Sequence, residues 1–174
     1  MSMSSTSLRL LSLALTACLL TACGFQLRGT GGAMVPDEWK SMHLVTDNPN
    51  GELAREVRTT FAASGVVWEE DWEEANYSMV LGGERFSQRN LSISADARAA
   101  EFELTMSTQF SVRDGDGNES MPPTTASVIQ QMENDPRNVV GKAEELRIIK
   151  SEMRVELAHQ MLRRIGFFAA STAP

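Results

Sequence analysis

The stretch from Ala100 to Val112 constrains the fold of this chain more than any other. Apolar and polar side chains alternate there, and a period of two places one set on each face of an extended strand. The apolar set is Phe102, Leu104, Met106, Phe110 and Val112, interrupted by Thr108, and the polar set is Glu101, Glu103, Thr105, Ser107, Gln109 and Ser111. We therefore expect one buried and one hydrated face, which is typical of an antiparallel sheet.

The segment before this strand predicts two further extended stretches. Tyr77 to Leu81 is an apolar run that suits a strand. Gly82 and Gly83 follow it and predict a bulge or a bend, after which the chain is expected to stay extended through Phe86 and Ile93.

The segment Asp114-Gly115-Asp116-Gly117-Asn118 follows the long strand and predicts a hairpin. Its alternating oxygen ligands also suggest a calcium loop, but that pattern requires Gly where Glu119 stands and Glu where Thr125 stands. We therefore favour a plain hairpin. The return strand is expected to begin near Thr124 at a sheet edge, because the prolines at 122 and 123 cannot donate hydrogen bonds.

Two segments have the period of an amphipathic helix. In the first, apolar residues recur every four positions from Leu53 to Phe61, with Asn48 expected as the cap, Pro49 as the first helical residue and Gly65 as the end. The second begins near Val140, and its apolar positions are Leu146, Ile149, Met153, Leu157, Met161 and Ile165. This methionine-containing stripe suits a ligand groove or an irregular core, and we favour the core.

The order of these elements predicts an α+β fold. Trp39 to Val45 suits a first strand and residues 66–68 a brief second one. We expect an antiparallel sheet of about four strands with two α-helices packed on one face. An acidic run from Glu69 to Glu74 lies between the early strands; it suits Ca²⁺ or a basic partner, but a solvated loop is the preferred interpretation.

Residues 1–22 have the parts of a secretory leader: a polar start with Arg9, an apolar core and small residues at the cut. The core of about a dozen residues is shorter than the ~20 that span a bilayer, which argues against a transmembrane helix. Leu20-Thr21-Ala22-Cys23 fits the bacterial lipoprotein signal, whose cysteine becomes the acylated N-terminus.

A second cysteine competes for this role. Leu15-Thr16-Ala17-Cys18 spells the same four residues, but a cut there leaves an apolar core of only about eight residues, so Cys23 is the favoured lipidation site. Gly24 stands where Asp would favour retention in the inner membrane. We therefore expect a lipid-anchored protein on the periplasmic side of the outer membrane.

The expected organisation has four segments: a signal peptide at 1–22, a lipid anchor and tether at 23–38, a single α+β domain at 39–168 and a short C-terminal tail at 169–174. Without the leader the chain has 15 basic and 23 acidic residues, which gives no general attraction to nucleic acid or to an anionic membrane.

Catalytic and metal-binding patterns are absent from the sequence. His43 and His159 do not have the spacing of metal ligands, and with Cys18 removed and Cys23 acylated no thiol is left for a nucleophile or a disulfide. We find no Ser/His/Asp order, Gly-rich phosphate loop or paired-carboxylate spacing. The sequence therefore predicts neither an enzyme nor a bound metal or cofactor.

The mature chain carries an ordered set of motifs: Cys-Gly-Phe-Gln-Leu-Arg at 23–28, Asp-Asn-Pro-Asn-Gly-Glu-Leu at 47–53 with Arg58 beyond it, Ala100-Glu101-Phe102, Asp135-Pro136, and Ile-Ile-Lys-Ser-Glu-Met at 148–153. In this order and spacing the motifs resemble those of the LptE family of lipopolysaccharide-assembly lipoproteins. The resemblance implies a sheet with two helices on one side. It also implies that the protein plugs the outer-membrane β-barrel of the lipopolysaccharide translocon (LptD-like) and assists assembly of that barrel. A further implication is that the protein binds lipopolysaccharide during its delivery to the cell surface.

The resemblance further implies two basic positions at the lipopolysaccharide head group. The position near the start of the last helix matches Lys142. At the other, in the loop before the long strand, Ala95 stands where an arginine is expected, and Arg98 follows three residues later. Lys142 and Arg98 are therefore the candidate ligands, with Arg89 as a third. The alternative is a generic outer-membrane lipoprotein adaptor without a lipid ligand, whose cations are solvated surface residues.

Overall fold

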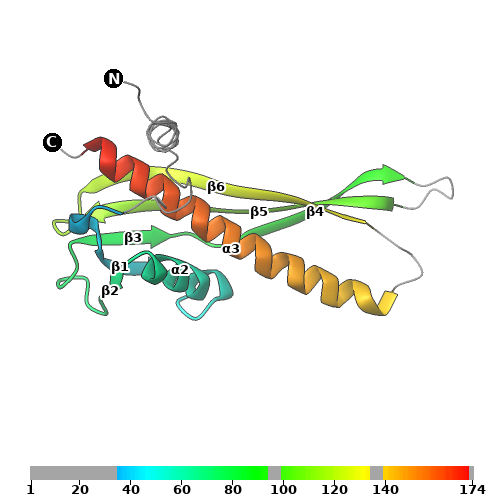
Figure 1. Cartoon of the computed structure of the whole chain (residues 1–174), viewed down its shortest axis with the longest axis horizontal. Coiled ribbons are helices and arrows are strands. Elements are labelled where there is room, and N and C mark those ends of the chain that lie inside the picture. The colour runs from blue at the N-terminus through cyan, green and yellow to red at the C-terminus, as the bar shows by residue number, and fades with distance from the viewer. Residues whose placement is uncertain (1–34, 94–98, 134–138, 173–174) are drawn as a thin grey trace, which may run out of the picture. The chain divides into compact units, whose positions relative to one another are not determined.

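The computed structural model describes residues 35–93, 99–133 and 139–172 of the 174. The elements are η1 (Asp37–Trp39), β1 (Ser41–Thr46), α2 (Glu52–Ala63), β2 (Val67–Trp68), β3 (Tyr77–Leu81), β4 (Arg85–Ile93), β5 (Ala99–Asp114), β6 (Glu119–Glu133) and α3 (Val139–Thr172) (Figure 1). The predicted leader, both cysteines, Arg98 and the Asp135-Pro136 motif lie outside the described residues.

The strands form one six-stranded sheet in the order β2-β1-β3-β5-β4, with β6 paired to β5. Strand β5 pairs with both β3 and β4 along one of its sides and with β6 along the other. Strand β1 runs parallel to both β2 and β3, and every other pairing is antiparallel. The α+β class is confirmed, and the sheet is larger than the four strands expected and mixed, because the α2 crossover brings β2 parallel to β1.

Gly82 is where the chain passes from β3 to β4. Its N–H donates to the carbonyl of Gln109 at 2.8 Å, and its own carbonyl accepts from the Thr108 hydroxyl at 2.9 Å. A Cβ at this position would lie 3.0 Å from the Gln109 carbonyl oxygen, so a larger residue would push against the backbone of β5. The predicted bend is confirmed, and it lets β3 and β4 pair with one side of the same strand.

The helix-covered face of the sheet carries the core. The alternating apolar residues of β5 are buried there, together with Leu53, Val57 and Phe61 of α2. From α3, the side chains of Met153, Leu157, Met161 and Ile165 are fully buried. The two helices also contact each other. The methionine-containing stripe is therefore core, as favoured from the sequence.

The start of α2 differs from the prediction. Its N-cap is Gly51 and its first residue Glu52, whereas Asn48 was expected to cap a helix beginning at Pro49. That prediction was wrong because Asn48 to Gly51 form a turn, closed by a Gly51 N–H bond to the Asn48 carbonyl at 3.0 Å. The other end follows the prediction, since Gly65 has a φ of +91° just beyond the helix.

The hairpin between β5 and β6 is confirmed, with the Asp114 carboxylate accepting from the backbone N–H of Asn118 at 2.8 Å. Strand β6, however, begins at Glu119 and not near Thr124. A register shift opposite Ser111 accommodates the two prolines within the strand, because a bulge needs fewer ladder hydrogen bonds. The edge position is confirmed, since β6 pairs only with β5 among the described strands.

Helix α3 continues through Thr172, so residues 169–172 of the segment expected as a tail are helical. Its last buried residue is Ala169, which belongs to the core. No helix within the described ranges is both long and apolar enough to cross a membrane.

Candidate functional site

The sheet presents two unlike faces. Side chains directly opposite each other in paired strands share a face, so the register assigns each residue to the helix-covered face or to the other. Over β4, β5 and β6 the other face carries Arg85, Ser87, Arg89, Glu103, Thr105, Ser107, Gln109, Thr125, Ser127, Ile129 and Gln131. We call this set the polar face. Apart from Ile129, it consists of hydroxyl, amide and charged side chains.

Lys142 lies near the start of α3 on the helix-covered side of the sheet. Its Nζ is 4.4 Å from the centroid of the Phe102 ring, and Phe102 is buried in β5. An ammonium over an aromatic face is attracted by the quadrupole of the ring, while the lysine stem covers apolar surface. The predicted cation is therefore held at one defined place beside the sheet.

A second lysine makes the same kind of contact. The Nζ of Lys150 lies 4.0 Å from the centroid of the Phe86 ring of β4, and both side chains are half-buried. Sequence reasoning missed this pair. The helical period places Lys150 beside the apolar stripe, but only the register of β4 shows which ring it meets.

Arg89, the third candidate, lies on the polar face and is bound to Glu103. Its Nε and Nη2 donate to the two carboxylate oxygens at 2.6 and 2.9 Å. This hydrogen-bonded pair raises the pKa of the Arg89 guanidinium and lowers the pKa of the Glu103 carboxyl. Because Phe102 and Glu103 are neighbours on a strand, Lys142 and Arg89 lie on opposite faces of the sheet, and the structure does not bring them together.

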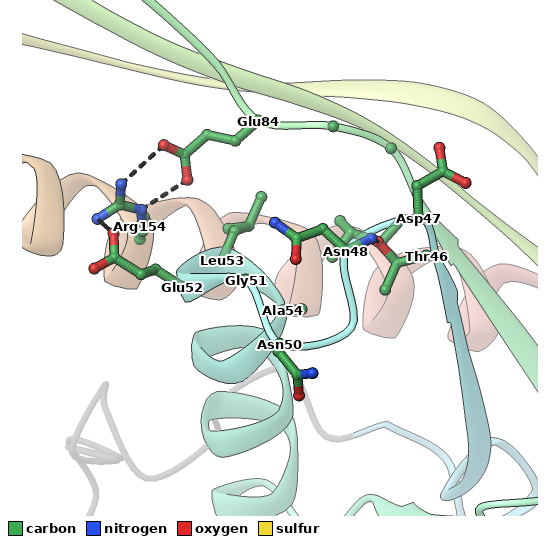
Figure 2. Close-up of a pocket in the computed structure, with 13 residues that line it drawn as sticks. Thr46, Asp47, Asn48, Asn50, Gly51, Glu52, Leu53, Ala54, Glu84 and Arg154 are labelled. Atoms are coloured by element: carbon green, nitrogen blue, oxygen red, sulfur yellow. Dashed lines mark hydrogen bonds and ion pairs between the residues drawn. The ribbon is translucent and has the colours of Figure 1, made fainter.

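Arg154 joins α3 to two other segments (Figure 2). Its guanidinium donates to both carboxylate oxygens of Glu84 at 2.7 and 2.9 Å, and its Nη1 lies 2.7 Å from Glu52 Oε2. The Arg154 side chain is only 13% exposed. The hydrogen bonds to Glu84 raise the pKa of Arg154. This junction fixes the start of α2 and the segment between β3 and β4 against the helix.

A pocket of about 540 Å³ lies beside this junction. The turn from Thr46 to Gly51 and the residues Gly82 to Glu84 line it, with the carboxylates of Asp47, Glu52 and Glu84 (Figure 2). Arg154, the one cation among the described lining residues, is already bound to two carboxylates. The chemistry of this pocket therefore does not suit an anionic ligand.

Three arginines of α3 are bound to carboxylates. Arg147 is bound to Glu144, Arg154 to Glu84 and Glu52, and Arg163 to Glu156. Lys142 and Lys150 lie over aromatic rings. An ammonium held over a ring lies directly beside apolar surface, so the two lysine–ring pairs are the better candidates for binding the anionic group of an amphiphile.

Comparison with known proteins identifies relatives over most of the chain. The family model described as "LptE: Lipopolysaccharide-assembly" matches residues 39–165. The LPS-assembly lipoprotein LptE of Photorhabdus laumondii is 33% identical over 159 residues, which cover 90% of this chain and 85% of that protein. The protein of the same name from Yersinia pestis is 31% identical over 160 residues, which cover 90% of this chain and 75% of its own length.

Solved structures share the fold. A rare lipoprotein B from Shewanella oneidensis aligns with a TM-score of 0.66 and 24% identity, over 75% of this chain and 96% of that one. A lipoprotein B from Nitrosomonas europaea aligns with a TM-score of 0.70 and 17% identity, over 84% and 93% of the two chains. The arrangement of one sheet and two helices therefore recurs in other lipoproteins.

Proposed function

Because this chain belongs to the LptE family of lipopolysaccharide-assembly lipoproteins, we propose that it plugs and assists the assembly of the outer-membrane β-barrel that translocates lipopolysaccharide. Family membership supports a lipoprotein of the cell envelope that acts in lipopolysaccharide assembly, and we propose that this role is not enzymatic. The finer proposal adds that it binds lipopolysaccharide while the glycolipid is delivered to the cell surface.

The observation that carries the plug proposal is the polar face. The polar face carries hydroxyl and amide side chains together with Arg85, Arg89 and Glu103. Such side chains suit the polar, hydrated interior of a large barrel. The apolar residues of the same strands are used in the core under the helices. One sheet can therefore stabilise its own domain and meet a polar lumen at the same time.

Photo-crosslinking tests this orientation. A photoreactive residue at Thr105 or Ser127 of the polar face is expected to crosslink to a barrel of much greater mass. A photoreactive residue at Glu152, an exposed position of α3, is expected to crosslink to the barrel less. Crosslinking from Glu152 alone would contradict the orientation. Deletion of the gene is expected to leave the barrel poorly assembled, and a barrel of normal abundance would contradict the assembly role.

Lys142 is the observation that supports lipopolysaccharide binding, because its ammonium lies beside a buried aromatic ring at the edge of apolar surface. Arg98 stays a candidate from the resemblance, and the Glu103 pairing makes Arg89 the weakest of the three. We expect Lys142→Glu combined with Arg98→Glu to weaken lipopolysaccharide binding while barrel assembly survives. Equal loss of both would assign these residues to the fold or to the barrel interface.

The same measurement separates this proposal from a lipoprotein adaptor without a lipid ligand. Purified wild-type protein is expected to bind lipopolysaccharide, and failure to bind would favour the adaptor. Cys23→Ala is expected to abolish acylation and release the protein from the membrane, because acyl chains contribute ~0.8 kcal/mol per buried methylene. Fatty-acid labelling that is retained in Cys23→Ala but lost in Cys18→Ala would identify Cys18 as the anchor.

A further inference from the structure

Two lysine–ring pairs follow one another along the contact between α3 and the sheet. The first is Lys142 over Phe102 of β5, and the second is Lys150 over Phe86 of β4. The proposed function uses only the first pair. Within the described part of the chain Lys150 forms no ion pair, although Arg147 and Arg154, each within one turn of it, are bound to carboxylates.

The spacing of the two pairs is set independently by the helix and by the sheet. Eight residues separate the lysines, which is a rise of ~12 Å along an α-helix. Phe86 lies opposite Met106, four residues along β5 from Phe102, and this separation is ~13 Å on a strand. The two estimates agree, which explains how each lysine can lie over its own ring. The two cationic positions are therefore roughly 12 Å apart along the helix.

The environment of Lys150 suits an anion on an amphiphile. Contact with the Phe86 ring holds the side chain in place, and the ammonium keeps N–H donors that a phosphate can accept. Phe86 packs against the core and is half-buried, so apolar surface begins directly beneath the charge. An arginine already bound to a carboxylate would have to give up that bond first.

We propose that Lys150 and Phe86 form a second phosphate subsite, so that the protein recognises a glycolipid through two phosphate groups at once. This inference rests on the proposed lipopolysaccharide binding and adds a residue and a ligand class to it. The ligand it selects is a diphosphorylated sugar lipid whose phosphates lie far enough apart to reach Lys142 and Lys150 together. A lipid with one phosphate occupies only one of the two positions.

The test uses the acylated mature protein in detergent and two probes: diphosphorylated lipid A and its monophosphorylated form. Lys150→Met is the informative variant, because methionine keeps an unbranched stem against the ring and removes the charge. Arg147→Met is the matched control, since it removes a cation from the same helix three residues away, where the side chain is exposed and paired with Glu144. Thermal unfolding of each variant is measured alongside binding.

Wild-type protein is expected to bind the diphosphorylated probe about tenfold more tightly than the monophosphorylated one, a difference of ~1.4 kcal/mol. Lys150→Met is expected to lose this preference while its melting temperature stays close to that of the wild type. Lys150→Arg is expected to keep most of the preference, and Arg147→Met all of it.

Two results would overturn the subsite, and they are distinguishable from failure of the proposed function. If Lys142→Gln weakens binding and Lys150→Met keeps the full preference for two phosphates, lipopolysaccharide binding stands and the Lys150 subsite falls. If Arg147→Met loses the preference as fully as Lys150→Met does, the effect is general charge and the subsite also falls. If the wild type binds neither probe, the proposed binding function itself fails.

Discussion

The two halves of helix α3 share one helical period but differ in how deeply their side chains are buried. In the second half, Leu157, Met161 and Ile165 are fully buried, and Gln160 and Arg164 bond to the backbone of β6. In the first half, the side chains that face the sheet before Met153 are only half-buried and include Lys142 and Lys150. A helix can therefore anchor a domain along one part of its length and hold charged side chains over aromatic rings along another.

The largest expected effect lies in the second half. Leu157→Ala is expected to lower the free energy of unfolding by ~2–5 kcal/mol, because the site is fully buried between helix and sheet. Ile149→Ala, at a partly buried position of the first half, is expected to cost clearly less. Chemical denaturation of both variants measures the difference, and equal losses would mean that the two halves contribute equally to the core.

Arg154 stands at the boundary between the halves and is expected to give the next largest effect. Arg154→Met removes the partner of Glu84 and Glu52, which leaves two carboxylates near each other at a partly buried junction. We expect a loss of about 1–2 kcal/mol, smaller than for a fully buried pair because solvent reaches Glu52. If Glu84→Gln in addition restores stability, the loss came from the unpaired carboxylate and not from packing.

A smaller effect is expected at the polar contacts of the second half. The Gln160 side-chain carbonyl accepts from the Ser127 backbone N–H at 2.9 Å, so Gln160→Ala leaves a backbone donor of the edge strand without this partner. The cost is expected to be about 0.5–1.5 kcal/mol in the free energy of unfolding. Faster hydrogen exchange confined to the Ser127 amide would support the assignment. Unchanged exchange there would show that this bond is not formed in solution.

The smallest effect concerns the exposed pair of the first half. The Arg147 guanidinium donates to Glu144 and lowers the pKa of that carboxyl. Because the pKa of Glu144 is lower in the folded protein than in the unfolded chain, the pair stabilises the fold at pH values above the pKa that Glu144 has in the unfolded chain. That contribution is lost as the pH falls through the pKa that Glu144 has in the folded protein. The melting temperatures of wild type and Glu144→Gln are therefore expected to converge between pH 7 and pH 3, and a constant difference would contradict this.

Local patterns predicted the elements that a single segment specifies. The alternation in β5 and the stripe of α3 predicted burial correctly, because each depends on the period of one chain segment. The turn at Asn48 and the early start of β6 at Glu119 were missed, since a proline is compatible with more than one local structure. The pairing of Lys150 with Phe86 joins residues 64 positions apart in the sequence. Only the strand register and the path of α3 bring them together.

The sharing of β5 by three neighbours also bears on how the chain folds. The pairing of β5 with β6 closes a turn of only four residues, Gly115 to Asn118, so it costs the least loop entropy of the pairings in the sheet. The parallel pairing of β1 with β3 must instead wait for a segment of thirty residues that contains α2. We therefore expect the β5–β6 hairpin to form early and to present the edge on which β3 and β4 assemble, with Gly82 determining the point at which the chain passes from one to the other.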